Sequence, residues 1–466
     1  MYAGRGYVTM TYSVRGHGNS SGLSTIMSTR ERQDLKRVLA FLRRFPGVNP
    51  AAVGIVGGSQ GGLHGLWAAA DRMPVKGITT DVIVPAWASD MLQNGSIRRT
   101  FCLLLSTAGV RYDTTRELYW KLLREDAYDS LNVLFPQNRD VSAKRLNGSH
   151  IPMLRFLKWQ DHYFGAANGI ATFSRYQGPK MLYIGTGGHF SDRSISESQV
   201  QSDLVTRWLG RFLRKDTMEA AYPVIQFAYS SLPMDSTGNF LWRQANTASW
   251  PPRGVHPLRL YLGSHSALHT DAEGSQSDSL TLRNRYLKPW YTFDTAFVEG
   301  FRGPRFDAAF PRSKLSFVST ELDTDIFWIG TPQMQITVLP DATTFPLHAQ
   351  VYEVDREGHK YFINRINFTA RHWEEGKKGV LRASGNVHAH RFQRGNRIRV
   401  DLTNIDVTNR NQLGTFPFVL PIFESSNVKI YVGGGQTSYI ELPVTLDLPS
   451  GGLTSATAAS RPVQGR

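Results

Sequence analysis

Cysteine is nearly absent from the sequence, because Cys102 is the only one in 466 residues. A single thiol excludes an internal disulfide framework and any zinc or iron–sulfur site built from several cysteines. No stretch of 18 consecutive apolar residues occurs, so the sequence predicts no membrane-spanning helix. It also lacks a Gly-x-Gly-x-x-Gly motif and a phosphate-binding P-loop, so nothing in it supports a nucleotide cofactor.

Acidic residues are outnumbered, 38 against 53 basic ones, which gives a formal net charge of +15. However, no block of five like charges occurs, and the basic residues are spread from Arg5 to Arg466. This pattern favours a basic surface over a dedicated polyanion site, so we expect no specific nucleic-acid partner. The 41% hydrophobic and 20% charged residues are typical of a globular protein and exclude wholesale disorder.

The first 220 residues alternate between strand-like and helix-like patterns, which is typical of a parallel sheet covered by helices. Residues 90–150 interrupt this alternation with helical patterns alone, so they predict an inserted helical cap. The expected strands are 7–14, 51–56, 79–84, 153–156 and 180–184, and the expected helices are 29–45, 63–72 and 197–214.

The pattern of the sequence changes at about Tyr222. Short alternating runs lie between turns rich in Gly, Pro, Asp and Asn, and no helix of three turns is expected. We therefore predict an α/β domain over 1–220 and an all-β sandwich or jelly-roll domain over 221–449. The Ser/Ala/Gly-rich tail 450–466 is predicted to be disordered.

The motif Gly-x-Ser-x-Gly occurs twice, around Ser20 and around Ser59. A nucleophile elbow needs a strand that runs directly into a tight turn and a helix that begins at once. Ser59 has strand 51–56 before it and a helical pattern after it, whereas Ser20 lies in a wide polar loop. Ser59 is therefore the predicted nucleophile.

A serine hydroxyl needs a base, and the base needs an acid that orients it. In folds that carry such an elbow, the serine comes first in the chain, the acid second and the histidine third, and the last two lie in loops after later strands. Asp161 and His189 follow the strands at 153–156 and 180–184 in that order, so they complete the predicted triad. The competing candidates are His162, Asp192 and His64.

A metal site receives little support. His388 and His390 share one strand face and could bind a metal, but no third ligand is evident. A solvated strand face is the preferred interpretation, and we expect neither a metal nor another cofactor.

Several stretches together resemble the bacterial cocaine esterase/glutaryl acylase/X-Pro dipeptidyl-peptidase family, that is, CocE/NonD-type α/β-hydrolases. The resemblance covers nearly the whole chain and implies a Ser59–Asp161–His189 triad, a helical cap and a C-terminal galactose-binding-like jelly roll. The stretches are Gly4-Arg5-Gly6-Tyr7, Arg15-Gly16-His17-Gly18-Asn19-Ser20-Ser21-Gly22, the elbow at Ser59, Trp159-Gln160-Asp161, Gly187-Gly188-His189, Trp250-Pro251-Pro252, Leu260-Tyr261-Leu262, 348–358 and 438–443.

The beginning of the chain departs from the family pattern. In the family the Arg-Gly-x-Gly loop follows a fourth strand, whereas only six residues precede the strand expected at 7–14. We expect a truncated gene model or a fragment. In relatives, the segment before this strand carries a tyrosine that is one donor of the oxyanion hole. Without that tyrosine, the N–H of Gln60 would be the remaining donor, and we expect impaired activity.

The predicted function is a serine hydrolase that cleaves an ester or amide bond, an esterase or acylase by preference. One alternative is an X-Pro dipeptidyl-peptidase, in which Glu125, Asp126 and Asp129 of the cap could bind a substrate amine. The other is a non-catalytic glycan- or surface-binding protein with a degenerate hydrolase half, which would use exposed aromatic residues. Those aromatic residues are Trp242, Trp250, Trp290 and Tyr291.

The expected partner is a small acyl ester, amide or short peptide substrate, and a homodimer is left open. The compartment is also open because an export signal could lie upstream of Met1, and the cytoplasm is favoured over export.

Overall fold

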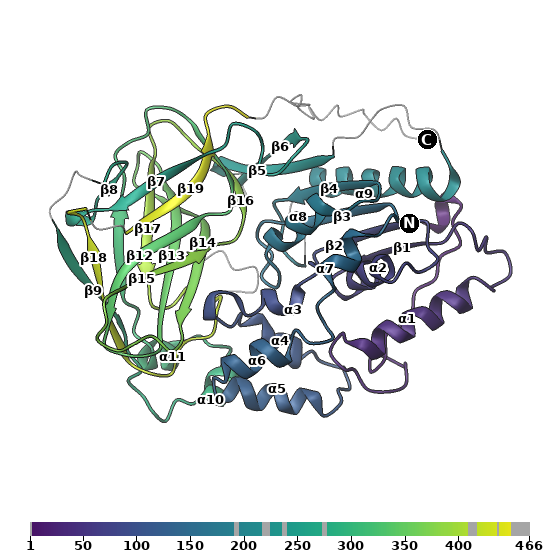
Figure 1. Ribbon diagram of the computed structural model, residues 1–466, viewed down its shortest axis with the longest axis horizontal. Helices are drawn as coiled ribbons and strands as arrows, with labels where there is room; N and C mark the ends of the chain where they lie inside the picture. Colours follow the sequence, from purple (N-terminus) through teal and green to yellow (C-terminus); the bar gives the residue numbers. More distant parts are fainter. Residues whose placement is uncertain are drawn as a thin grey trace, which may run out of the picture.

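The computed structural model describes residues 2–190, 195–216, 224–234, 240–272, 277–408, 417–435 and 438–448 (Figure 1). The tail predicted to be disordered, 450–466, lies outside these residues, as do 217–223 at the predicted domain boundary. That boundary remains a proposal. No helix among the described residues is long and apolar enough to cross a membrane.

The first part of the chain forms a parallel sheet with helices on it, as the alternating pattern predicted. Its strands are β1 (Gly54–Gly58), β2 (Gly77–Asp81), β3 (Met153–Lys158) and β4 (Lys180–Gly185), and they lie in the order β1-β2-β3-β4. The helices around it are α1 (Thr29–Leu42), α2 (Gln60–Ala70), α8 (Ala166–Arg175) and α9 (Ile195–Leu209), which continues as a π-helical turn, η3 (Gly210–Arg214).

The strand expected at 7–14 is absent, and this prediction was wrong. A strand needs a neighbour to which its backbone can hydrogen-bond, and β1, the nearest candidate, pairs only with β2 among the described strands. The segment contacts α2 through a side chain. The Tyr12 hydroxyl lies 2.7 Å from Nδ1 of His64 on α2.

A helical cap follows β2, as expected for 90–150. It contains α3 (Trp87–Asp90), α4 (Thr100–Leu105), α5 (Thr115–Arg124), α6 (Tyr128–Leu134) and α7 (Ala143–Asn147). Of two short helices in the second half, α10 (Phe293–Val298) lies beside the cap and α11 (Pro304–Ala309) lies below the strands of the sandwich (Figure 1). The indole ring of Trp120 packs 4.7 Å from the ring of Phe297, so the two halves share an apolar contact at the cap.

The second half is β-rich, as predicted, and its longest described helices have six residues. One layer is a four-stranded sheet of β10 (Lys314–Val318), β17 (Arg397–Thr403), β13 (Phe345–Val354) and β14 (Lys360–Ala370). The facing layer contains β7 (His256–Leu262), β8 (Leu268–His269), β9 (Asp278–Asn284), β11 (Ile326–Gly330), β12 (Gln333–Pro340), β15 (Gly379–Ser384), β16 (His388–Phe392), β18 (Ser426–Val432) and β19 (Tyr439–Thr445). A buried apolar cluster fills the space between the layers.

One strand joins the two halves. β5 (Ile225–Met234) pairs in parallel with β4 through residues 225–227 and with β16 through residues 230–231, and it also forms a hairpin with β6 (Phe240–Thr247). The parallel sheet therefore continues through β5 into the sandwich.

The expectation of a solvated face at His388 and His390 was wrong. β16 lies between β5 and β11, and both imidazoles are buried. Nε2 of His390 lies 2.8 Å from the Glu353 carboxylate, and Nδ1 lies 2.8 Å from the Ser230 hydroxyl. This Ser–His–Glu row is enclosed in the core, because each of the three residues is at most 4% exposed, so it serves the packing of β5 against the sandwich.

Candidate active site

Ser59 occupies the sharp turn between β1 and α2. Its backbone has φ 51° and ψ −123°, a conformation that non-glycine residues rarely adopt. The turn is fixed by two backbone hydrogen bonds, from Ser59 N to the carbonyl of Asp81 and from Leu63 N to the carbonyl of Ser59. A side chain at Gly57 would overlap the backbone of Gly61, so this close approach requires glycine at position 57. The geometry is that of a nucleophile elbow.

Asp161 lies in the loop that follows β3, and its side chain is 2% exposed. Its Oδ1 accepts hydrogen bonds from the N–H groups of Tyr163 at 2.8 Å and Phe164 at 3.1 Å. These two donors hold the carboxylate in one orientation and stabilise its charge.

His189 lies in the loop that follows β4 and connects the other two residues. Nδ1 lies 3.0 Å from both carboxylate oxygens of Asp161, and Nε2 lies 2.9 Å from Oγ of Ser59. The structure thus brings all three predicted residues into one hydrogen-bonded row. In the tautomer with a proton on Nδ1, the ring donates to Asp161 and its Nε2 can accept the serine proton.

Aromatic rings surround the imidazole of His189, whose side chain is 5% exposed. The ring centroids of Tyr163, Phe190 and Phe164 lie 4.4, 5.1 and 5.5 Å from it. Burial raises the pKa of Tyr163 to about 12, and the nearby Asp161 adds to that shift, so this phenol stays protonated at neutral pH. Enclosure by apolar rings strengthens the electrostatic interaction between His189 and Asp161.

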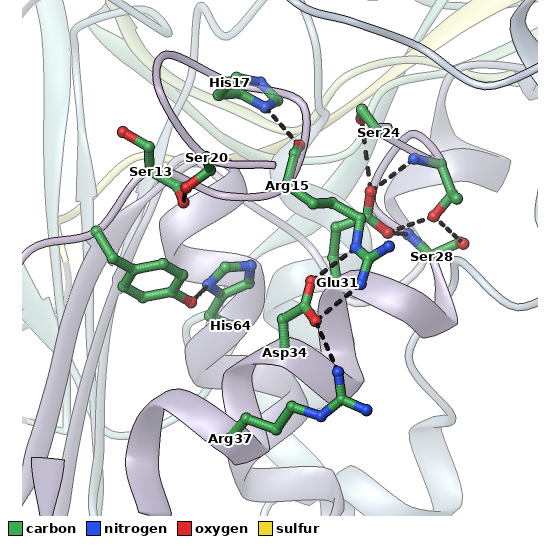
Figure 2. Close-up of polar contacts among 12 residues, drawn as sticks. Ser13, Arg15, His17, Ser20, Ser24, Ser28, Glu31, Asp34, Arg37 and His64 are labelled. Carbon is green, nitrogen blue, oxygen red and sulfur yellow. Dashed lines mark hydrogen bonds and ion pairs between the residues drawn. The ribbon is translucent and has the colours of Figure 1, made fainter. Parts of the chain in front are cut away.

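The competing histidines lie elsewhere. His162 points its Nδ1 at the carbonyl of Gln160, 2.8 Å away, and burial lowers its pKa to about 4. His64 faces Tyr12 (Figure 2), and burial lowers its pKa to about 4 as well. Asp192 lies outside the described residues.

The second Gly-x-Ser-x-Gly motif forms a loop rather than an elbow. The hydroxyl of Ser20 donates to the carbonyl of Ser13 at 2.5 Å, and the loop is tied to α1 through Arg15, which forms an ion pair with Asp34 (Figure 2). The hydroxyl of Ser20 thus has a backbone carbonyl as its partner in place of a base.

The oxyanion donor predicted from the sequence, the N–H of Gln60, lies at the first residue of α2. The N–H groups of a first helical turn have no acceptor within the helix, and they carry the positive end of the helix dipole. This places a free donor directly beside the serine.

The cap carboxylates proposed as amine ligands contact other side chains. Asp126 forms an ion pair with Arg371, and Asp129 lies 2.6 Å from Nε2 of His372. Glu125 lies 3.9 Å from Lys121 on the same helix face. Asp126 and Asp129 thus connect the cap to the turn after β14.

The aromatic residues considered for sugar stacking have mixed positions. Tyr291 is buried, Trp250 packs 5.7 Å from Trp159, and Trp290 is 57% exposed. The side chain of Trp242 lies outside those described. Within the described ranges, the residues that could jointly hold a metal ion are Asp355, Glu357 and His359, in the turn between β13 and β14.

Sequence reasoning missed a buried ion pair, Asp90 with Arg98, that contacts the loop after Asp161. Asp90 accepts a hydrogen bond from Gly165 N at 2.5 Å and lies 3.1 Å from the guanidinium of Arg98. Burial raises the pKa of Asp90 to about 6, against the influence of Arg98. No short motif marks the place of this pair, because its contact with the loop after Asp161 is made by Gly165, 75 positions after Asp90 in the chain.

Comparison with known proteins shows two family models that match parts of the chain. Residues 1–127 match the family model "X-Pro dipeptidyl-peptidase (S15 family)", and residues 226–440 match "X-Pro dipeptidyl-peptidase C-terminal non-catalytic domain". No curated protein matches the chain.

Solved structures share the fold along nearly the whole chain. A CocE/NonD family hydrolase from Staphylococcus aureus has a TM-score of 0.68 at 14% identity, covering 93% of this chain and 79% of that one. An alpha-amino acid ester hydrolase has a TM-score of 0.69 at 16% identity, with coverages of 92% and 84%. An aminopeptidase from a marine sediment Thaumarchaeota archaeon has a TM-score of 0.67 at 13% identity, with coverages of 93% and 84%.

These matches confirm the fold class and the family resemblance inferred from the sequence. The chain is a hydrolase whose first 127 residues are similar to the S15 family of X-Pro dipeptidyl-peptidases and whose residues 226–440 are similar to the C-terminal domain of those enzymes, and it shares its fold with CocE/NonD family hydrolases.

Proposed function

We propose that the chain is a serine hydrolase in which Ser59 is the nucleophile, His189 the general base and Asp161 the residue that orients the base. The observation that carries the proposal is the hydrogen-bonded row from Ser59 Oγ through the imidazole of His189 to Asp161, with distances of 2.9 and 3.0 Å. A nucleophile, a base within hydrogen-bond reach and an orienting acid are the parts that acyl transfer requires.

The reaction follows from the positions of these groups. His189 Nε2 takes the proton from Ser59 Oγ as the oxygen attacks the carbonyl carbon of an ester or amide. The imidazolium returns that proton to the leaving group as the bond to it breaks, which leaves an acyl-enzyme. A water then attacks the acyl carbon, gives its proton to His189 and releases the acid, and Ser59 recovers its proton.

The N–H of Gln60 is the donor that we assign to the oxyanion of the tetrahedral intermediate. Removal of one donor from an oxyanion hole typically costs about 10²–10³ in rate. If Gln60 acts without a second donor, kcat will be lower by a factor of that order than in a hydrolase with two donors.

An esterase or acylase is our first choice of activity, and an X-Pro dipeptidyl-peptidase is the second. The names of both matching family models favour the peptidase. The contacts of the cap favour the esterase, because Asp126 and Asp129 are engaged by Arg371 and His372 rather than left to bind a substrate amine.

A panel of p-nitrophenyl esters assayed beside Gly-Pro-p-nitroanilide tests the proposal. We expect ester hydrolysis that is lost in Ser59→Ala. Preferential cleavage of the anilide would favour the peptidase, and equal rates for wild type and Ser59→Ala on every substrate would contradict both.

A further inference from the structure

A buried carboxylate lies behind the histidine loop. Glu197 is in the first turn of α9, eight residues after His189, and it has no solvent exposure. Its Oε1 accepts hydrogen bonds from the N–H of Thr186 and from the hydroxyl of Tyr183, each at 3.0 Å. Its Oε2 accepts a hydrogen bond from the hydroxyl of Thr186 at 2.6 Å.

The backbone at Gly185 leaves room for this carboxylate. A Cβ at Gly185 would overlap Oε1 of Glu197 and would lie 3.2 Å from Cδ of Lys158, the last residue of β3. Gly185 therefore leaves the space that Glu197 fills at the end of β4. An ionised carboxylate is costly to bury without partners, and the hydrogen bonds from Tyr183 and Thr186 offset this cost.

Thr186 lies at the root of the loop that carries His189. Between them are Gly187 and Gly188, which have no side chains that could fix the loop. The position of the imidazole therefore depends on how firmly Thr186 is held.

The same segment also contacts the loop of Asp161. The N–H of Trp159 donates to the carbonyl of Gly185 at 3.0 Å, and the N–H of Gln160 donates to the carbonyl of Gly187 at 3.4 Å. A shift of residues 185–187 would thus change the distance between His189 and Asp161 as well as that between His189 and Ser59.

We propose that Glu197 is a positioning residue of the active site, which holds Thr186 and thereby keeps His189 in line with Ser59 and Asp161. This inference rests on the proposed serine hydrolase function. Glu197 acts through Thr186 and touches none of the reacting atoms. Misplacement of a catalytic group by about 1 Å can cost about 10²-fold in rate, which sets the size of the expected effect.

The test compares Glu197→Ala, Glu197→Gln and Thr186→Val with Glu353→Gln as the matched control. Glu353 is another carboxylate without solvent exposure, and it accepts hydrogen bonds from Gln393 N and the Asn396 amide in the sandwich. Each variant is assayed below its melting temperature for the rate of labelling by a fluorophosphonate and for kcat and KM on a p-nitrophenyl ester.

We expect Glu197→Ala to lower the labelling rate and kcat by about 10²-fold with little change in KM. Glu197→Gln and Thr186→Val, which each keep part of the contact, should lose less. Glu353→Gln should lower the melting temperature and leave the labelling rate and kcat unchanged.

Wild-type labelling rates and kcat in both Glu197→Gln and Thr186→Val would overturn the inference, even if Glu197→Ala fails to fold. The proposed function fails separately, if wild-type protein is not labelled or if Ser59→Ala is labelled equally fast.

Discussion

Substitution of Asp161 by Asn tests whether the carboxylate sets the tautomer of His189. Oδ1 of Asp161 accepts hydrogen bonds from two N–H groups, those of Tyr163 and Phe164. An asparagine must keep its carbonyl oxygen on that side, because an NH₂ group would face two donors. Its NH₂ group is then directed to the position of Oδ2, 3.0 Å from Nδ1 of His189.

The consequence for His189 follows from hydrogen-bond chemistry. An NH₂ group can only donate, so at the Oδ2 position it opposes a proton on Nδ1 and favours Nδ1 as its acceptor. The remaining acceptor, Oδ1, also lies 3.0 Å from Nδ1 but already accepts from two N–H groups, so we expect the ring proton to move to Nε2. Nε2 can then no longer take the proton of Ser59. We expect kcat/KM for a p-nitrophenyl ester to fall by about 10⁴-fold, or about 5.5 kcal/mol of transition-state stabilisation.

Assays of Asp161→Asn should include the melting temperature, because the variant keeps the shape of the side chain and its two backbone contacts. A loss of less than tenfold in a folded variant would refute the reasoning and would mean that another group orients His189.

Two further predictions concern the elbow and the buried histidines. In Gly57→Ala the new Cβ overlaps the backbone of Gly61, so we expect a loss of about 1–3 kcal/mol in urea unfolding together with reduced esterase activity. In the matched variant Gly61→Ala the Cβ meets nothing within 4 Å, so an equal loss of stability there would contradict the packing argument. Burial lowers the pKa of His64 to about 4 from its ordinary 6.5, so the stability that its neutral form contributes is complete above pH 6.5 and is lost as the pH falls toward 4. His64→Gln should therefore reduce the pH dependence of the unfolding free energy between pH 6 and 5 by about 1 kcal/mol per pH unit, and parallel urea-unfolding profiles would show that His64 is accessible to protons in the folded state.

Local patterns were sufficient to predict much of the fold. Near Ser59 the strand, turn and helix follow each other within a few residues, so sequence spacing alone defines the elbow. The order of Asp161 and His189 after two later strands could be predicted for the same reason. Each depends on where a strand ends, which the apolar runs reveal.

Features that depend on partners distant in the chain could not be predicted. The run at 7–14 has strand-like composition, yet no described strand pairs with it. His388 and His390 were expected at a surface because their burial depends on β5, which lies more than 150 positions earlier in the chain. Glu197 is the first residue of the helix expected at 197–214, and the sequence gives no sign of its contact with Thr186, because that contact requires the folded loop.

The position of covalent labelling tests the central claim most directly. Wild-type protein is treated with a fluorophosphonate and digested, and the modified peptide is located by mass spectrometry. The account predicts a single adduct on Ser59, which is absent from Ser59→Ala. An adduct on Ser20 or on any other serine, at equal yield in the two proteins, would contradict it.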